Sequence, residues 1–479
     1  MGFSPIKNLG GIFTFLVFFG VLSVLIYIDF LPLLAFPIGL LAIYVALFYP
    51  DYLLIAIFFM TPLSFNIEEF TTSFGLYVPT EPLLFGLMML TIWRLFLVKK
   101  IPNYIFKNLI VIALASYLLV TFFTSIVSTH PLISFKALLS KLWYIIPIFG
   151  IGIKAFEKKK MMVLCIWLYN IGMTFAIIYT VIRHSMYGFG EQESHWVMSP
   201  LFKDHTIYGA MVAFSLPLVV GLYFYKKHDL LTSGILITLI TINLIGLFFS
   251  YTRAAWLSVI VAAMVWMLIY FRVKFAYLVS IFLVGVVFVA FNWTHIYYTL
   301  AQNKKEHTTD NFEDRLRSAG NISSDASNLE RINRWDCALQ MFQKKPLTGF
   351  GPGTYAFEYA PFQRPENLTI ISTNFGNGGN AHSEYLLNLS EMGIFGLLTF
   401  VFFVSMVFYR GIRLYFRLED REYKILVLSM VLALSTYFLH AFLNNFLDTD
   451  KAAVPIYGIC AFFIATEHLL SQINEQAKN

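Results

Sequence analysis

The residue best placed to bind an anion is Arg253, which follows the turn Ser250-Tyr-Thr252 between two apolar runs. An arginine does not lose its proton in proteins, and its planar guanidinium presents a fork of hydrogen-bond donors. The N–H groups of a helix N-terminus add further donors, so Arg253 could hold a phosphate. The alternative is an arginine whose side chain reaches lipid headgroups from the end of a helix. Position alone favours neither interpretation.

A second group of cationic residues lies in Glu330-Arg-Ile-Asn-Arg-Trp335. Apolar residues recur at helical spacing from 330 to 343, which predicts an amphipathic helix that Pro346 ends. Arg331 shares the apolar face with Trp335 by i,i+4 spacing, whereas Arg334 is expected nearer the edge. Each arginine could bind an anion or form an ordinary ion pair with Glu330 or Asp336. The sequence leaves open which of the two faces a site.

The strongest candidate for a general base is His382, at the start of another apolar run. A histidine with a pKa near 6.5 can accept a proton at neutral pH, for instance from a sugar hydroxyl at a membrane surface. The simpler interpretation is a polar residue at a helix start. Glu391 lies about two turns further into the apolar run, where an ionisable residue is a candidate functional group.

Two further positions are secondary candidates. Lys141 lies inside an apolar run and predicts a cavity or an acidic partner. His205 opens another apolar run from a polar loop. Asp448 and Asp450 form a compact pair that could hold a divalent metal, although two acids in a short loop are more often solvated. We therefore predict no metal site and no cofactor.

The composition indicates that the protein carrying these residues is a membrane protein. Of 479 residues, 58% are apolar and 13% are charged, and the mean hydropathy is +0.69. Soluble domains carry about 25% charged residues. A soluble enzyme, a disordered chain and a disulfide scaffold are excluded. The net charge of +6 is typical of basic cytoplasmic loops and does not indicate a nucleic-acid partner.

The apolar runs predict an all-α polytopic integral membrane protein with 12–14 transmembrane helices. The first three runs contain several prolines and are the least secure. The predicted spans are 12–28, 31–49, 52–65, 79–97, 108–127, 132–153, 161–182, 205–225, 232–250, 253–271, 274–292, 383–409, 425–443 and 452–470.

The distribution of Lys and Arg predicts the orientation. Basic residues concentrate in alternate connections, which places those connections and both termini in the cytoplasm. Two large loops, 183–204 and 292–381, then face outward. We expect three parts: an N-terminal bundle of about eleven spans over 1–292, a long periplasmic loop with short helices over 293–382, and about three spans over 383–479.

Three segments in this order resemble the O-antigen ligase / O-antigen polymerase family of bacterial membrane glycosyltransferases. They are Ser250-Tyr-Thr-Arg-Ala-Ala-Trp256, then Arg331-Ile-Asn-Arg-Trp335 with Lys345-Pro-Leu-Thr-Gly-Phe-Gly-Pro-Gly353, and finally His382-Ser-Glu-Tyr-Leu with Glu391-Met-Gly-Ile-Phe-Gly396. The resemblance spans roughly 204–411. Within it, Thr252 and Ser383 replace the family's usual Ser and Asn, and neither change removes a charge.

The resemblance implies a metal-independent, inverting glycosyltransferase of the bacterial inner membrane with a periplasmic active site. The donor would be a glycan on undecaprenyl diphosphate, and the acceptor a hydroxyl such as one on the lipid A core. His382 would be the catalytic base, and Arg253 and Arg331 would bind the diphosphate. Arg334, Lys141, Glu391 and His205 remain secondary candidates.

Several other functions stay open. A polysaccharide polymerase or a protein O-oligosaccharyltransferase would use the same donor and differ in the acceptor. A polysaccharide flippase or other transporter is the alternative from a different class. A transporter predicts internal repeats and charged residues at the membrane midplane. The sequence has no detectable repeat, and its polar motifs cluster at the predicted outer surface.

Overall fold

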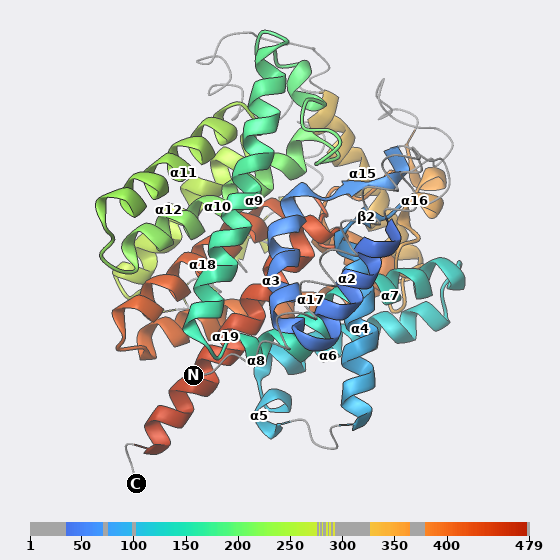
Figure 1. The fold of residues 1–479 in the computed structure, drawn as a ribbon. Coiled ribbons are helices and arrows are strands. Elements are labelled where there is room, and N and C mark those ends of the chain that lie inside the picture. Colours follow the sequence, from blue (N-terminus) through green and yellow to red (C-terminus); the bar gives the residue numbers. More distant parts are fainter. Residues whose placement is uncertain are drawn as a thin grey trace.

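The computed structural model describes residues 35–69, 75–97, 102–274, 326–364 and 379–476, with a few single positions between 277 and 292. The described chain is almost entirely helical. Its one sheet pairs β1 (Phe65–Asn66) with β2 (Tyr77–Val78), antiparallel, with Phe65 opposite Val78. Figure 1 shows the long helices side by side in one bundle.

The helices before residue 230 form the first part of the bundle. They are α2 (Ala35–Phe48), α3 (Pro50–Met60) with the 3-10 turn η2 (Thr61–Leu63), η3 (Ile67–Glu69), α4 (Thr80–Leu97), α5 (Asn103–Phe106), α6 (Leu109–Ile126), α7 (Pro131–Pro147) continued by η4 (Ile148–Gly152) and α8 (Ile153–Ala155), α9 (Lys159–Ser185), η5 (Glu193–His195) and α10 (His205–Phe224).

The later helices include the segments that carry the sequence motifs. They are α11 (Leu230–Phe248), α12 (Arg253–Tyr270), α15 (Ala326–Lys344), α16 (Tyr355–Glu358), η6 (Ala360–Phe362), α17 (Glu384–Arg417), α18 (Arg421–His440) and α19 (Asp450–Gln476).

The protein is an all-α polytopic membrane protein, as predicted. Among the described residues, ten helices are long and apolar enough to cross a membrane, and two shorter apolar helices cover Gly39–Phe48 and Pro50–Leu63. These twelve correspond to twelve of the predicted spans, with ends that differ by up to eight residues. The predicted span 12–28 lies outside the described residues, and most of 274–292 does too.

The centre of the bundle is α10, which packs against α9, α11, α12 and α18 (Figure 1). Glycines allow this close packing. A Cβ on Gly221 would lie 2.4 Å from the Ser429 side chain of α18, and one on Gly209 would lie 2.8 Å from Thr252. Small residues at helix contacts are the usual means of close approach in membranes, where the hydrophobic effect does not drive helices together.

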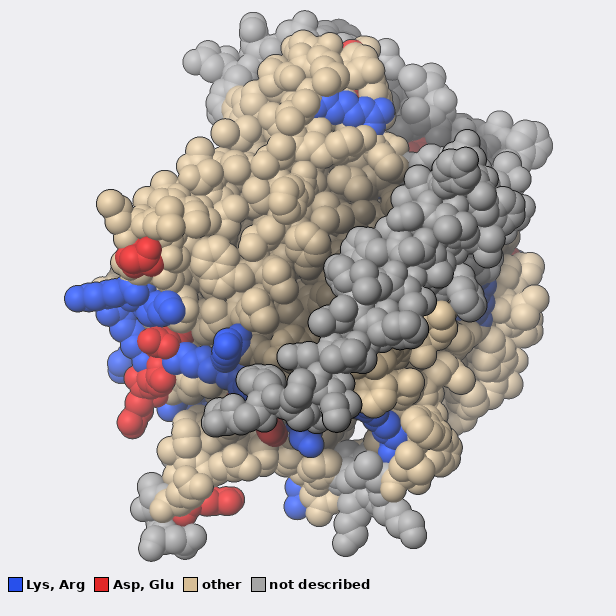
Figure 2. Space-filling view, viewed as in Figure 1, with Lys and Arg blue, Asp and Glu red and all other residues tan. Residues whose placement is uncertain are grey.

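The two ends of the bundle differ in charge. On the face drawn in Figure 2, most visible Lys and Arg side chains gather near the lower end, where the C-terminus lies, and the middle carries almost no charge. Lys159 bonds to Asp420 and Glu422 at the start of α18, and Arg410 pairs with Glu467. The opposite end of the bundle holds α15, α16 and the starts of α10, α12 and α17.

The helix α15 confirms the amphipathic helix predicted over 330–343, but its buried face differs from the expectation. Arg334 is 4% exposed, whereas Arg331, Trp335 and Leu339 are only partly buried. The reason is a second small core formed against α16 and α17. It contains Cys337, Ala338, Met341, Phe350, Tyr355, Tyr359, Ala381 and Leu387. Contacts with this core turn the Arg334 side of α15 inward.

Candidate functional site

The backbone of His382 is held in an unusual conformation just before α17. Its φ of 47° lies in the left-handed region, which residues other than glycine rarely adopt. Asn380 Oδ1 accepts a hydrogen bond from His382 N at 3.0 Å, and Trp335 Nε1 donates to His382 O at 3.2 Å. These bonds engage the backbone and leave the imidazole to other uses. Strained backbone of this kind concentrates at functional sites.

The surroundings of His382 keep its imidazole neutral. Burial, followed by the positive charges of Arg331 and Arg334, lowers the pKa of His382 to about 4, against smaller opposing effects of Glu330 and Asp204. A neutral imidazole at pH 7 can accept a proton. Asp204 and the charged residues 330–334 of α15 are therefore near His382, at the same end of the bundle.

The two arginines of α15 have different environments. Arg334 Nε donates to Glu330 Oε1 at 2.6 Å in a buried ion pair, and its guanidinium lies 3.9 Å from the centre of the Tyr359 ring. A Cβ on Gly379 would lie 1.9 Å from Arg334 Nη1, so the chain before His382 passes directly over this guanidinium. Arg334 is thus buried and paired with protein groups, whereas Arg331 on the same helix is partly exposed.

Arg253 is the first residue of α12 and is partly buried. The N-terminus of α12 is joined to that of α10, because Thr252 Oγ1 donates to His205 O at 2.8 Å. The preceding Tyr251 has φ of 50°, and its hydroxyl donates to Phe189 O at 2.7 Å. Two helix N-termini, each a partial positive charge, therefore lie together beside Arg253.

His205 lies in the same region but is involved in packing. Its ring stacks on His195 with centroids 4.2 Å apart. Asp204 caps α10 by accepting from Thr206 N at 2.8 Å and Ile207 N at 3.1 Å. Asp204, which acts weakly on the charge of His382, directly precedes His205, whose carbonyl accepts from Thr252 next to Arg253.

Lys141 has the acidic partner that the sequence predicted, since it forms an ion pair with Asp448. The pair lines a small polar cavity together with Tyr117, Glu384, Asn388 and Glu391. Most of these groups already bond to protein: Tyr117 donates to Asn388 Oδ1 at 2.8 Å, and Glu384 Oε1 accepts from Leu447 N at 2.7 Å.

Glu391 holds the glycine-rich loop against α17. Its two carboxylate oxygens accept from Gly353 N at 2.8 Å and Tyr355 N at 3.0 Å. Helix α17 is broken at Gly393, where φ is 67°. The break leaves the carbonyl of Glu391 free to accept from Gly351 N at 2.7 Å, and Ile394 N donates to Pro346 O at 2.9 Å. The glycine motif thus docks into the break.

The two aspartates of the 444–451 loop point to different partners. Asp448 pairs with Lys141, and Asp450 is buried and accepts from the Ser64 and Thr80 hydroxyls. Within the described part of the chain, no group of three or more His, Cys, Asp or Glu side chains could hold a metal ion.

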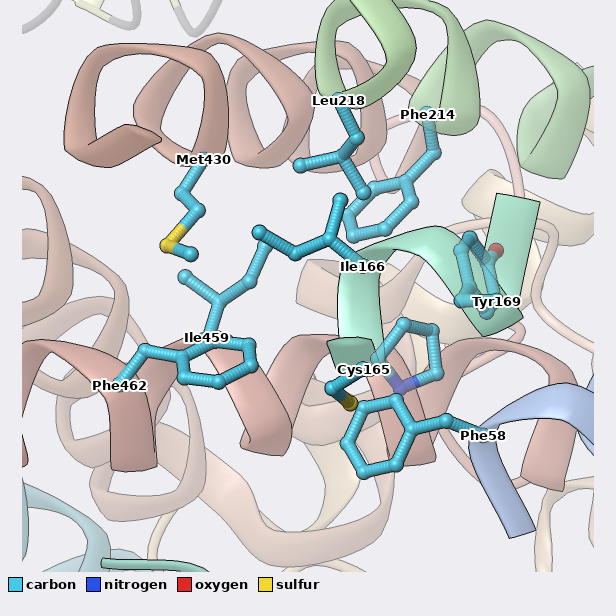
Figure 3. Close-up of a pocket in the computed structure, with 10 residues that line it drawn as sticks. Phe58, Cys165, Ile166, Tyr169, Phe214, Leu218, Met430, Ile459 and Phe462 are labelled. Atoms are coloured by element: carbon cyan, nitrogen blue, oxygen red, sulfur yellow. The ribbon is translucent and has the colours of Figure 1, made fainter. Parts of the chain in front are cut away.

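An apolar cavity lies elsewhere, inside the bundle between α3, α9, α10, α18 and α19. Figure 3 shows Phe58, Cys165, Phe214, Met430 and Phe462 directed into it. None of the charged candidates lines this cavity, so we regard it as a packing defect of the core.

Some site residues were not predicted from the sequence. Asn380 and Tyr359 were not singled out, and neither was His440, which ends α18 close to Arg331. The polar residue Asn380 two positions before His382 was a readable signal. Nothing in the sequence connects Tyr359 or His440 with the motifs.

The fold and the charged cluster together define a polytopic membrane protein with a histidine and arginines at one end of its bundle. Residues 236–401 match the family model Wzy_C, O-Antigen ligase. This match supports the O-antigen ligase family for that part of the chain. No curated protein matches the chain. The matched region includes Arg253, Arg331, Arg334, His382 and Glu391, whereas Lys141 and His205 lie before it.

Proposed function

We propose that the protein transfers a glycan from undecaprenyl diphosphate to a hydroxyl acceptor, such as one on the lipid A core. An O-antigen ligase or polymerase type of function follows in general from the family domain. The observation that carries the specific proposal is the position of His382, which has a left-handed backbone conformation and is bonded through its carbonyl to Trp335 of α15, the helix that also carries Arg331 and Arg334. A base can take the proton of an acceptor hydroxyl. A fixed cation can stabilise the charge of a departing diphosphate.

The proposed reaction is a direct displacement. His382 takes the proton of the acceptor hydroxyl, whose oxygen forms a bond to the anomeric carbon as the carbon–oxygen bond to the diphosphate breaks. The configuration at that carbon is inverted. General-base catalysis typically contributes about 10²–10⁴-fold. Arg253 and Arg331 would stabilise the charge that develops on the diphosphate, with bidentate hydrogen bonds and without a metal.

The proposed location is the periplasmic face of the bacterial inner membrane, with both termini in the cytoplasm. The charge distribution supports this orientation, because Lys226, Lys227, Arg421 and Lys424 lie at the end of the bundle opposite to His382. The partners would be the lipid-linked donor, the acceptor and membrane lipid, with no nucleic acid. A bundle-end site also argues against a flippase, whose charges belong at the midplane.

The test is a surface-glycan gel from a strain that lacks this gene, with lipid-linked intermediates extracted in parallel. A ligase predicts that long polymer accumulates on undecaprenyl diphosphate while the lipid A core stays bare. Cores that carry single repeat units without a ladder would identify a polymerase. Normal lipopolysaccharide with glycans missing from protein would indicate a protein O-oligosaccharyltransferase. No change in any glycan or lipid-linked intermediate would overturn the proposal.

A further inference from the structure

A second histidine, His440, ends α18 at the candidate site. Its side chain is 1% exposed. The carbonyl of the next residue, Ala441, accepts a hydrogen bond from Glu384 N at 2.9 Å, which joins the end of α18 to the start of α17. His382 and His440 therefore lie on two segments that this bond holds together.

The hydrogen bonds of His440 determine its tautomer. Its Nδ1 lies 3.1 Å from Asn444 Nδ2, and an amide nitrogen only donates. Nδ1 is then an acceptor, so the proton of the neutral ring is on Nε2. Nε2 is buried and has no hydrogen-bond partner among the described residues. A buried donor without a partner is rare and destabilising, and it calls for an explanation such as a ligand.

The neighbours of His440 indicate which ligand. The end of α18 is bonded to Glu384, the His382 carbonyl two residues earlier accepts from Trp335 of α15, and Arg331 lies one turn before Trp335. Arg331, Asp204 and His205 also act electrostatically on the His440 ring. Arg331 is also the arginine that acts most strongly on His382. An uncharged N–H donor beside an arginine suits an oxyanion, since both can donate to oxygens of the same phosphate.

We propose that His440 Nε2 donates a hydrogen bond to a phosphate oxygen of the donor's diphosphate, next to Arg331. This inference rests on the proposed function. Because Nδ1 is occupied by Asn444 and Nε2 carries the proton, His440 acts as a neutral donor and does not duplicate the base role of His382. The diphosphate thereby gains a contact from α18, in addition to those from α12 and α15.

The test measures binding of inorganic pyrophosphate and of geranylgeranyl diphosphate to the full-length protein in detergent, by thermal unfolding. The variants are His440→Met and His440→Gln. The two new side chains are similar in size, but only Gln has an amide that can donate a hydrogen bond. The control is His468→Phe, which lies in the C-terminal part of α19. We expect His440→Met to weaken both ligands about tenfold. His440→Gln should bind nearly as tightly as wild type.

A role in ligand binding and a merely structural role predict different results without ligand. Removing an unpartnered donor should leave the unfolding temperature of the ligand-free His440→Met protein unchanged or raise it. A lower unfolding temperature with unchanged affinity would overturn the inference. If His440→Met does not fold, His440→Phe provides the same comparison with His440→Gln.

The result also separates this inference from the proposed function. Weak binding in Arg331→Ala together with normal binding in both His440 variants would refute the role of His440 and leave the proposed function standing. If the wild-type protein binds neither diphosphate, both proposals are overturned.

Discussion

At the scale of single residues, the catalytic proposal depends on a histidine that stays neutral. Burial and the charges of Arg331 and Arg334 lower the pKa of His382 to about 4. A base is active in its unprotonated form, which predominates at every pH above its pKa. We therefore expect kcat/KM to be flat from neutral pH downward and to fall only near pH 4, because kcat/KM reports the pKa of the free enzyme.

The measurement is the pH dependence of glycan transfer with purified protein, with stability checked at each pH. An acidic limb between pH 6 and 7 would mean that the base is a solvated histidine or another group, and would contradict the environment assigned to His382.

The second prediction at this scale concerns Arg253. Arg253→Lys keeps the positive charge but loses the bidentate geometry, so we expect kcat/KM for the lipid-linked donor to fall about 10–100-fold. Arg183→Lys is the matched control, because Arg183 lies in the last turn of α9 and donates to the Tyr179 hydroxyl. Full activity of Arg253→Lys, equal to that of the control, would favour an arginine that only contacts lipid headgroups.

At the scale of elements, the broken helix α17 positions both His382 and the glycine loop. Glu391 has two carboxylate oxygens that each accept a backbone N–H of this loop. Glu391→Gln replaces one acceptor with a donor, which would face an N–H group. We expect a loss of about 1–3 kcal/mol in the free energy of unfolding, together with reduced transfer.

Thermal unfolding in detergent measures this effect, and Glu419→Gln at an exposed position serves as the control. Unchanged stability and activity of Glu391→Gln would show that the loop does not depend on this carboxylate.

The elements show how far the sequence could predict the structure. Length and hydropathy identify the spans, because each helix must cross the same apolar thickness. The break at Gly393 was not predicted, since the apolar pattern continues across it and the break is stabilised by the distant residues 346–351. The rotation of α15 also escaped prediction. It depends on Tyr359 and Gly379, whose contacts with Arg334 are tertiary.

At the scale of the whole molecule, the candidate site gathers residues from five distant segments: 204–205, 253, 331–334, 382 and 440. The predicted topology puts 204–205, 253 and 382 at span ends on one side of the membrane and 331–334 in the loop on that side, so these four segments were expected to share one end of the bundle. Which residues touch could not be predicted, because helix neighbours are not encoded in hydropathy. His440 is an example, because it is a single histidine near the end of a predicted span and belongs to none of the sequence motifs.

The whole site is expected to work without a metal, with arginines providing the positive charge. We predict that dialysis against EDTA leaves the rate of glycan transfer unchanged, and that added Mg²⁺ or Mn²⁺ has no effect. The carboxylates Asp448 and Asp450 already bond to Lys141 and to Ser64 and Thr80. A loss of activity that a divalent cation restores would contradict this account and direct attention to those two aspartates.

The most direct test of the central claim is glycan transfer by the purified protein in liposomes, with wild type and His382→Ala compared. The substrates are undecaprenyl-diphosphate-linked glycan and lipid A core extracted from the source cells. We predict that wild type forms the product, whereas His382→Ala folds, inserts and forms essentially none. Product formation by His382→Ala at the wild-type rate would contradict the assignment of His382 as the base.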